Sequence, residues 1–177
     1  RLLHSRRVTI PPPRFDPKRR RAVVFALLLV TALASFESTV VSTAMPTIIG
    51  DLHGLTLYSW VFSVYLLTST ISMPLFGRLA DLWGRRRVLL AAMAFFLAGA
   101  LACALARSMP GLIAARALQG LGAGGVMPVA LTVTGDLFSI EERAKVQGLF
   151  SGVWGVASLA GPLLGAFLTV TFGWRSI

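Results

Sequence analysis

The chain has 177 residues, of which 55% are hydrophobic and only 14% are charged. Soluble domains carry about 25% charged residues, so this composition excludes a soluble globular protein. Lysine and arginine outnumber aspartate and glutamate by 17 to 7, but the basic residues lie in short segments between apolar stretches, which favours a membrane protein over one that binds nucleic acid.

Residues 1–21 form a basic, proline-rich tail. They hold eight of the 17 basic residues, cannot bury a core, and are expected to lie disordered against anionic lipid headgroups. An alternative is a secretory signal peptide, because the apolar stretch after Arg21 contains Ala32-Leu33-Ala34, an A-x-A pattern. Against cleavage, this stretch continues to Ile49, well beyond the roughly 7 to 15 residues of such a signal.

Five apolar stretches follow, each long enough for the roughly 20 helical residues that cross a bilayer. Backbone groups in lipid must pair within their own segment, which favours helices. The predicted fold is an all-α membrane protein, with a membrane domain at residues 22–177. Its transmembrane helices are expected at about 22–48, 57–77, 88–106, 110–135 and 146–171.

The orientation follows from lysine and arginine in the short connections. The tail holds eight, the second connection four and the fourth connection two, whereas the opposite side holds only Arg107 and Arg175. Because cytoplasmic loops are enriched in these residues, we expect a cytoplasmic N-terminus. The expected location is the plasma membrane, which in a bacterium is the inner membrane.

Two charged residues lie inside the apolar stretches, Glu37 in the first and Arg116 in the fourth. At a rise of about 1.5 Å per residue, both lie about 8 to 9 Å from the outer edge of the hydrocarbon core, so they could pair. Such a pair could merely fix the helix register. We favour a carboxylate that binds and releases a proton, because burial favours the neutral acid and a nearby arginine favours the ionised one.

Hydroxyl side chains surround Glu37. They could line a wet cavity or could bond back to their own helix. The set is Ser35, Ser38, Thr39, Ser42 and Thr43.

The fifth stretch carries small residues every three or four positions: Gly148, Gly152, Gly155, Ser158, Gly161 and Gly165. Such a stripe lets another helix approach closely, and Pro162 within it bends the helix. The stripe could serve packing alone or could form a hinge or seal in a moving bundle.

Residues 120–125 match G-x-G-x-x-G, the pattern of a dinucleotide-binding loop. That loop needs a preceding strand, whereas these glycines lie inside an apolar stretch of transmembrane length, so helix packing is the better explanation. One cysteine and two histidines argue against a metal site, and no nucleophile, base and metal constellation supports an enzyme. No cofactor or metal is therefore expected.

Four motifs together resemble the major facilitator superfamily, in particular its fourteen-span drug–proton antiporters. Residues 77–87 resemble the signature G-x-L-a-D-r-x-G-r-k-r between the second and third spans, with Leu82 in place of a basic residue. The resemblance implies that Asp81 and Arg85 join Asp136 in a cytoplasmic charge cluster that latches the outward-open state. The conformational latch is thus expected to comprise Gly77, Asp81, Gly84, Arg85 and Asp136.

The other three motifs lie within spans. Residues 116–122 resemble R-x-x-q-G-x-g, residues 161–166 resemble G-P-x-x-G-G with Ala166 in the last place, and residues 37–46 resemble D-x-T-v-v-x-x-A-x-P with Glu37 for the aspartate. The resemblance implies proton coupling by Glu37 and Arg116 and a substrate cavity with Thr39 and Gln119. It further implies helix packing by Gly155, Gly161, Pro162 and Gly165.

The resemblance covers only five of about fourteen spans. We therefore expect an N-terminal fragment, comprising most of the first six-helix bundle of a transporter whose C-terminal spans are missing here. Its expected function is proton-coupled export of lipophilic drugs or toxic compounds, with the bilayer, protons and a small-molecule substrate as partners. The alternatives are a metabolite or sugar transporter of the same superfamily, or a truncated membrane protein without transport activity.

Overall fold

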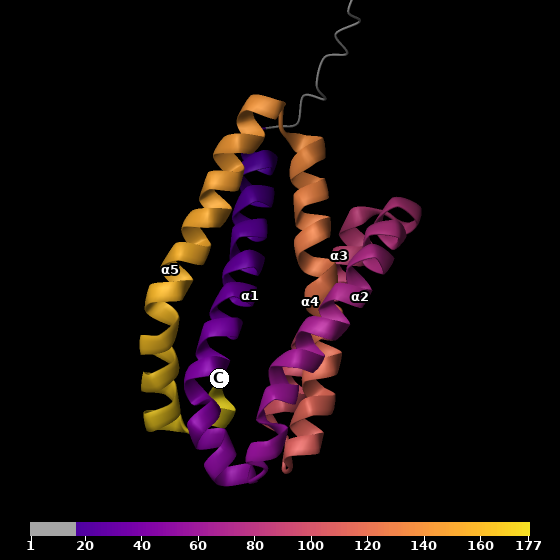
Figure 1. Ribbon diagram of the computed structural model, residues 1–177. Coiled ribbons are helices and arrows are strands. Elements are labelled where there is room, and N and C mark those ends of the chain that lie inside the picture. The colour runs from indigo at the N-terminus through magenta and orange to yellow at the C-terminus, as the bar shows by residue number, and fades with distance from the viewer. Residues whose placement is uncertain (1–16) are drawn as a thin grey trace, which may run out of the picture.

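The computed structural model describes residues 17–177 and consists of five long helices (Figure 1). The helices are α1 (Pro17–Leu52), α2 (Tyr58–Trp83), α3 (Arg85–Ala104), α4 (Met109–Leu137) and α5 (Ile140–Phe172). Two short 3₁₀ helices follow α1 and α5, namely η1 (Leu55–Leu57) and η2 (Trp174–Ser176). All five long helices are long and apolar enough to cross a membrane. The predicted all-α membrane fold is confirmed.

Most helices extend beyond the predicted spans. The prediction that the tail is disordered is wrong for residues 17–21, which belong to α1; residues 1–16 lie outside the described part. Proline is well suited to the first helical turn and arginine is a good helix former, so a helix can begin at Pro17. In contrast, α3 ends at Ala104, two residues before the predicted end.

The turns have local causes. Gly84 separates α2 from α3 with a φ of 88°, a conformation that glycine adopts without steric cost. Before α5, the Ser139 hydroxyl accepts a hydrogen bond from the Glu142 amide, and the Glu142 carboxylate accepts one from the Ser139 amide. This reciprocal cap starts a new helix only two residues after α4 ends.

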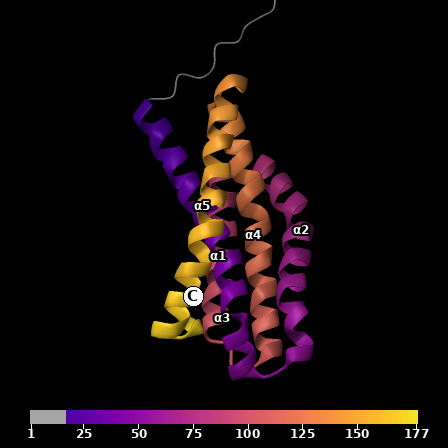
Figure 2. The same ribbon diagram turned by 60° about the vertical axis from the view of Figure 1, so that its left-hand side comes forward.

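The helices form two groups (Figures 1 and 2). Helix α4 packs along both α2 and α3, and α1 packs along α5. Glycines allow the first arrangement, because a Cβ atom on Gly122 would lie 2.5 Å from the Ala92 carbonyl oxygen of α3. On the other side of α4, Gly120 and Gly124 face the α2 backbone at Tyr65 and Ser69. The G-x-G-x-x-G pattern thus serves close helix packing, as the sequence indicated.

Apolar clusters join the two groups near both ends of the bundle. The cluster near η2 contains Ala44, Met45, Ile48, Val61, Ala106, Met109, Leu112 and Trp174. The cluster near the opposite end contains Leu27, Ala130, Val146 and Phe150. Between the two clusters, α1 meets α4 through polar side chains, which form the site described below.

The glycine stripe of α5 contacts α1 over only part of its length. Gly161 packs against Thr39, and a Cβ on Gly165 would lie 3.1 Å from the Val40 Cα, whereas nothing lies within 4 Å of a Cβ on Gly152. Gly148 and Gly155 are equally open, so among the described residues only the later part of the stripe packs against a helix. The spacing of the stripe is shorter than the 3.6-residue helical repeat, and Gly152 lies about two and a half turns before Gly161, on the opposite face.

Candidate functional site

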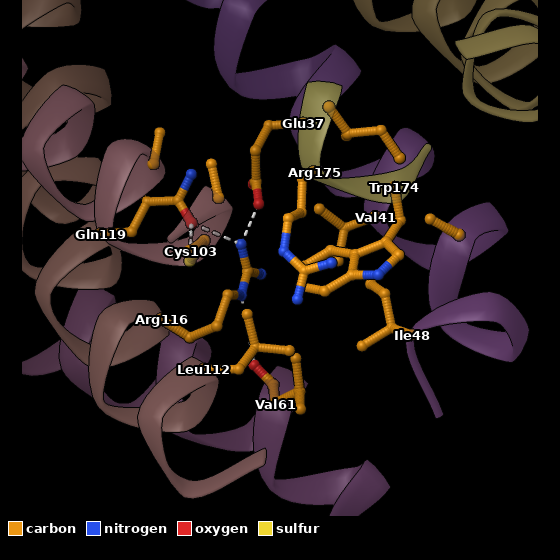
Figure 3. A pocket seen from close by; sticks show the side chains of 14 residues that line it. Glu37, Val41, Ile48, Val61, Cys103, Leu112, Arg116, Gln119, Trp174 and Arg175 are labelled. Carbon is orange, nitrogen blue, oxygen red and sulfur yellow. Dashed lines mark hydrogen bonds and ion pairs between the residues drawn. The ribbon is translucent and has the colours of Figure 1, made fainter. Parts of the chain in front are cut away.

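Arg116 is the buried centre of the site, with a side chain that is 3% exposed (Figure 3). Its Nη1 donates hydrogen bonds to Glu37 Oε1 and, at 2.7 Å, to Gln119 Oε1. Its Nε donates to the Val61 carbonyl at 3.3 Å, and its guanidinium lies 4.2 Å from the centre of the Tyr65 ring. Residues from α1, α2 and α4 therefore hold one cation.

Glu37 reaches this cation from α1. The two residues expected at matching depth are in direct contact, and the Glu37 side chain is 10% exposed. Only one carboxylate oxygen is satisfied, because Oε2 is buried and has no hydrogen-bond partner within the part of the chain that the structure describes. An ionised carboxylate with an unpaired buried oxygen is costly, so this atom is poised to bind a proton or a water molecule.

A cavity of about 60 Å³ adjoins the pair. Glu37, Arg116 and Gln119 contribute its polar wall. Cys103 of α3 also lines it, and its thiol lies 3.7 Å from Gln119 Oε1. The volume suffices for water molecules, which would find polar partners here. Gln119, expected in the substrate cavity, lines this small cavity, and whether substrate binds there stays a prediction; the involvement of Cys103 was not anticipated.

The segment after α5 closes this cavity at one end. Trp174 is buried, its Nε1 donates a hydrogen bond to Asp51 Oδ2 at 2.7 Å, and both Trp174 and Arg175 line the cavity (Figure 3). Arg175 stacks on the Trp174 ring at 4.3 Å and donates to the Ala106 carbonyl at 3.3 Å. Sequence reasoning missed these residues, although an aromatic and a charged residue directly after an apolar span were a usable signal.

Four of the five hydroxyls around Glu37 bond back to carbonyls of their own helix, whereas Ser42 is exposed. Ser35 donates to the Thr31 carbonyl at 2.7 Å, and Ser38 donates to the Ser35 carbonyl at 2.9 Å. Thr39, expected in the substrate cavity, instead faces α5: it donates to its own helix and packs against Gly161. Two residues along a helix turn a side chain by about 200°, which explains why Thr39 and Glu37 point to different sides.

The predicted latch residues are only partly brought together. Arg85 forms an ion pair with Asp136 and also donates to the Thr132 carbonyl at 3.4 Å. Asp81 is exposed and has no ion-pair partner among residues 17–177. Gly84 forms the turn before Arg85, whereas a Cβ on Gly77 would meet nothing within 4 Å. The structure therefore contains a pair, Arg85 and Asp136, in place of the expected three-residue charge cluster.

Only some of the predicted packing residues contact another helix. Gly161 and Gly165 contact α1, Gly155 is open, and Pro162 lies exposed inside α5 without ending the helix. Within residues 17–177, no group of three histidine, cysteine, aspartate or glutamate side chains could hold a metal ion.

Comparison with known proteins places this arrangement in context. Residues 27–177 match the profile of the Major Facilitator Superfamily. The chain is 41% identical over 157 residues to the multidrug transporter protein MdtP of Bacillus subtilis, a match that covers 89% of this chain and 29% of that protein. It is 40% identical over 153 residues to the efflux pump dotC of Dothistroma septosporum, a match that covers 86% of this chain and 26% of that protein.

Among solved structures, the human organic anion transporter MFSD10 has a similar fold, with a TM-score of 0.71 at 23% identity over 92% of this chain and 45% of that chain. The chain thus spans less than a third of the length of the two relatives named above.

Proposed function

Because the chain belongs to the major facilitator superfamily, we propose that it forms the first part of a proton-coupled antiporter that exports lipophilic drugs or toxic compounds. The names of the relatives, a multidrug transporter and an efflux pump, support this direction of transport and this class of substrate. The chain covers less than a third of their length, so the complete activity needs further spans.

One observation carries the proposal: a buried carboxylate, paired on one oxygen and unpaired on the other, adjoins a cavity that can hold water. Intramembrane acids of this kind commonly mark proton pathways. When Glu37 takes up a proton, it ceases to neutralise Arg116, which remains charged because an arginine does not lose its proton in a protein. The pair is then weakened, and α1 is freer to move relative to α4.

The other partners of Arg116 lower the energetic cost of protonating Glu37. Gln119, the Val61 carbonyl and the Tyr65 ring hold the guanidinium independently of Glu37. The cation therefore stays solvated by protein groups while the carboxylate is neutral. Proton binding thus shifts the balance between two arrangements of the bundle, as alternating access requires.

The end of α4 that carries Asp136 would control the other conformational step of the transport cycle. We expect it to be cytoplasmic, because the basic residues gather there. The ion pair between Arg85 and Asp136 would act as the latch, together with Gly77 and Gly84, and the exposed Asp81 carboxylate would complete it with a residue of the further spans. Gly155 and Pro162 of α5 would likewise contact those spans.

The test is Glu37→Gln in the complete transporter. Glutamine keeps an oxygen that can accept a hydrogen bond from Arg116 but cannot exchange a proton, so we expect normal membrane levels and loss of proton-driven efflux. The measurement is drug efflux from vesicles under an imposed proton gradient. Glu142→Gln, the same change in a side chain that is 44% exposed, is the matched control and should retain efflux. Unchanged efflux with Glu37→Gln would contradict the proposal and would mean that the buried pair only fixes the register of α1 against α4.

A further inference from the structure

A groove with a volume of about 550 Å³ lies between the first turns of α1 and α5. Its lining residues on α1 precede Glu37 by nine residues or more and lie toward the end of the bundle where α1 begins. Three basic side chains line it, Arg20 and Arg21 of α1 and Lys145 of α5. Neither the proton-coupling pair nor the predicted latch uses Arg21 or Lys145.

The charges in this groove do not balance. Glu142 is the only acidic residue among the described side chains that line it, and its carboxylate already accepts from Arg20 at 2.5 Å and from the Ser139 amide at 3.1 Å. Arg21 and Lys145 form no ion pair with any side chain that the structure describes, so these two cations are unpaired within that set. An anion of about two charges or a diffuse layer of anionic groups would complement them.

Arg20 adds a separate sign of an absent partner. Its guanidinium lies 4.0 Å from the centre of the Phe138 ring, which fixes its position. Its Nε is buried, yet it has no hydrogen-bond partner in the described part of the chain. Buried N–H donors are nearly always paired, so this donor indicates an acceptor outside the side chains that the structure describes.

The floor of the groove is apolar. Phe25 lies one turn beyond Arg21 and is 63% exposed, and Leu149 lies one turn beyond Lys145 and is 51% exposed. Val24 and Leu28 continue this surface along α1. The basic residues thus lie one helical turn, about 5 to 6 Å, from the apolar ones. This arrangement matches a phospholipid, in which a charged headgroup is followed by an apolar acyl chain.

We propose that this groove binds one anionic phospholipid, with its phosphate between Arg21 and Lys145 and an acyl chain along Phe25 and Leu149. A soluble phosphate compound would leave the apolar floor in contact with water, which favours a lipid. A zwitterionic lipid would bring its own cation next to the two unpaired ones, which favours a net negative headgroup. This site is independent of the proposed transport function.

The test is native mass spectrometry of the full 177-residue chain, purified in detergent and mixed with phosphatidylglycerol or phosphatidylcholine. We expect one phosphatidylglycerol molecule to bind at least about tenfold more tightly than phosphatidylcholine. The double substitution Arg21→Gln/Lys145→Gln should weaken phosphatidylglycerol binding about tenfold or more, since each basic group near an anionic lipid contributes appreciably. Glycerol 3-phosphate, a headgroup without acyl chains, should not compete.

The matched control is Arg78→Gln/Arg87→Gln, which removes two exposed arginines of α2 and α3 that do not line the groove. It should leave binding unchanged. Equal losses in the two double variants would indicate general surface attraction, equal binding of both lipids would indicate an apolar groove, and competition by glycerol 3-phosphate would indicate a soluble ligand; each would overturn the proposal. If the double variant loses its helical circular dichroism, Arg21→Gln and Lys145→Gln are tested singly against Arg78→Gln.

Discussion

Helices α4 and α5 carry similar sequences but have opposite surroundings. Both are apolar, glycine-rich and interrupted by one proline. In the most apolar 18-residue window of α4, 50% of the residues are buried, against 17% in α5. The glycines of α4 at positions 120, 122, 124 and 125 all lie against α2 or α3, whereas the first three glycines of α5 lie against nothing.

A small-residue stripe therefore indicates where another helix can approach closely, not where one does. On α4, glycines on successive positions serve two neighbours, and the close packing encloses Arg116 so that protein groups replace water around it. On α5, only the part of the stripe that faces α1 is used. Helix α4 therefore packs closely against two helices and also holds a buried charge. The stability of variants in α4 and α5 measures how far the two helices differ.

The largest loss of stability is expected when Arg116, the buried charge of α4, loses its partner Glu37. Glu37→Leu leaves Arg116 buried and unneutralised, and removal of one partner of a buried ion pair costs about 3–5 kcal/mol. The double substitution Glu37→Leu/Arg116→Leu removes both charges and should recover most of this loss. The measurement is the free energy of unfolding in mixed detergent micelles.

The control for this first prediction is the ion pair that α5 forms with α1. Arg20→Gln opens the pair with Glu142, whose side chains are 31% and 44% exposed, and should shift the unfolding midpoint far less. A loss for Arg20→Gln as large as that for Glu37→Leu would mean that the exposed pair at the start of α1 stabilises the fold as much as the buried pair at its middle.

A smaller loss of stability is expected when a methyl group is added to α4 where it packs against α3. In Gly122→Ala, the new Cβ would lie 2.5 Å from the Ala92 carbonyl oxygen and 2.7 Å from the Phe96 Cα, so α3 and α4 must separate. Overpacking of this kind costs about 1–3 kcal/mol, and alanine returns about 0.5–1 kcal/mol through its higher helix propensity. We expect a net loss of about 1–2 kcal/mol in the same unfolding assay, and an unchanged value would contradict the close approach.

Particular residues show how much of this arrangement the sequence could predict. Length and the scarcity of charge sufficed for five helices, and the helical rise placed Glu37 and Arg116 at one depth. The rotation of each helix was beyond reach, because helices that are apolar on all sides have no face marked for the core. The contacts of Arg116 with Tyr65 and the Val61 carbonyl, and the orientation of Thr39 toward α5, depend on that rotation.

Contacts between residues far apart in the sequence were also beyond reach. Asp51 and Trp174 are 123 positions apart, and no periodicity links them, yet their hydrogen bond closes the cavity next to Glu37. Gln119 lines the same cavity as Arg116 because it follows Arg116 by one helical turn, which is the spacing in the motif. Local spacing was thus informative, and long-range pairing was not.

The smallest effect, of opposite sign, is expected on α5. A Cβ on Gly152 would meet nothing within 4 Å, and the residue is exposed inside a regular helix. In the 177-residue chain, Gly152→Ala should therefore gain the helix propensity of alanine without a packing penalty, about 0.5–1 kcal/mol of added stability in the unfolding assay used for Gly122→Ala. Because the substitution is identical at both sites, the propensity gain cancels in the comparison, and the difference in sign isolates the contact. A loss of stability for Gly152→Ala would place another helix against this face of α5 and would make α5 a second packing centre like α4.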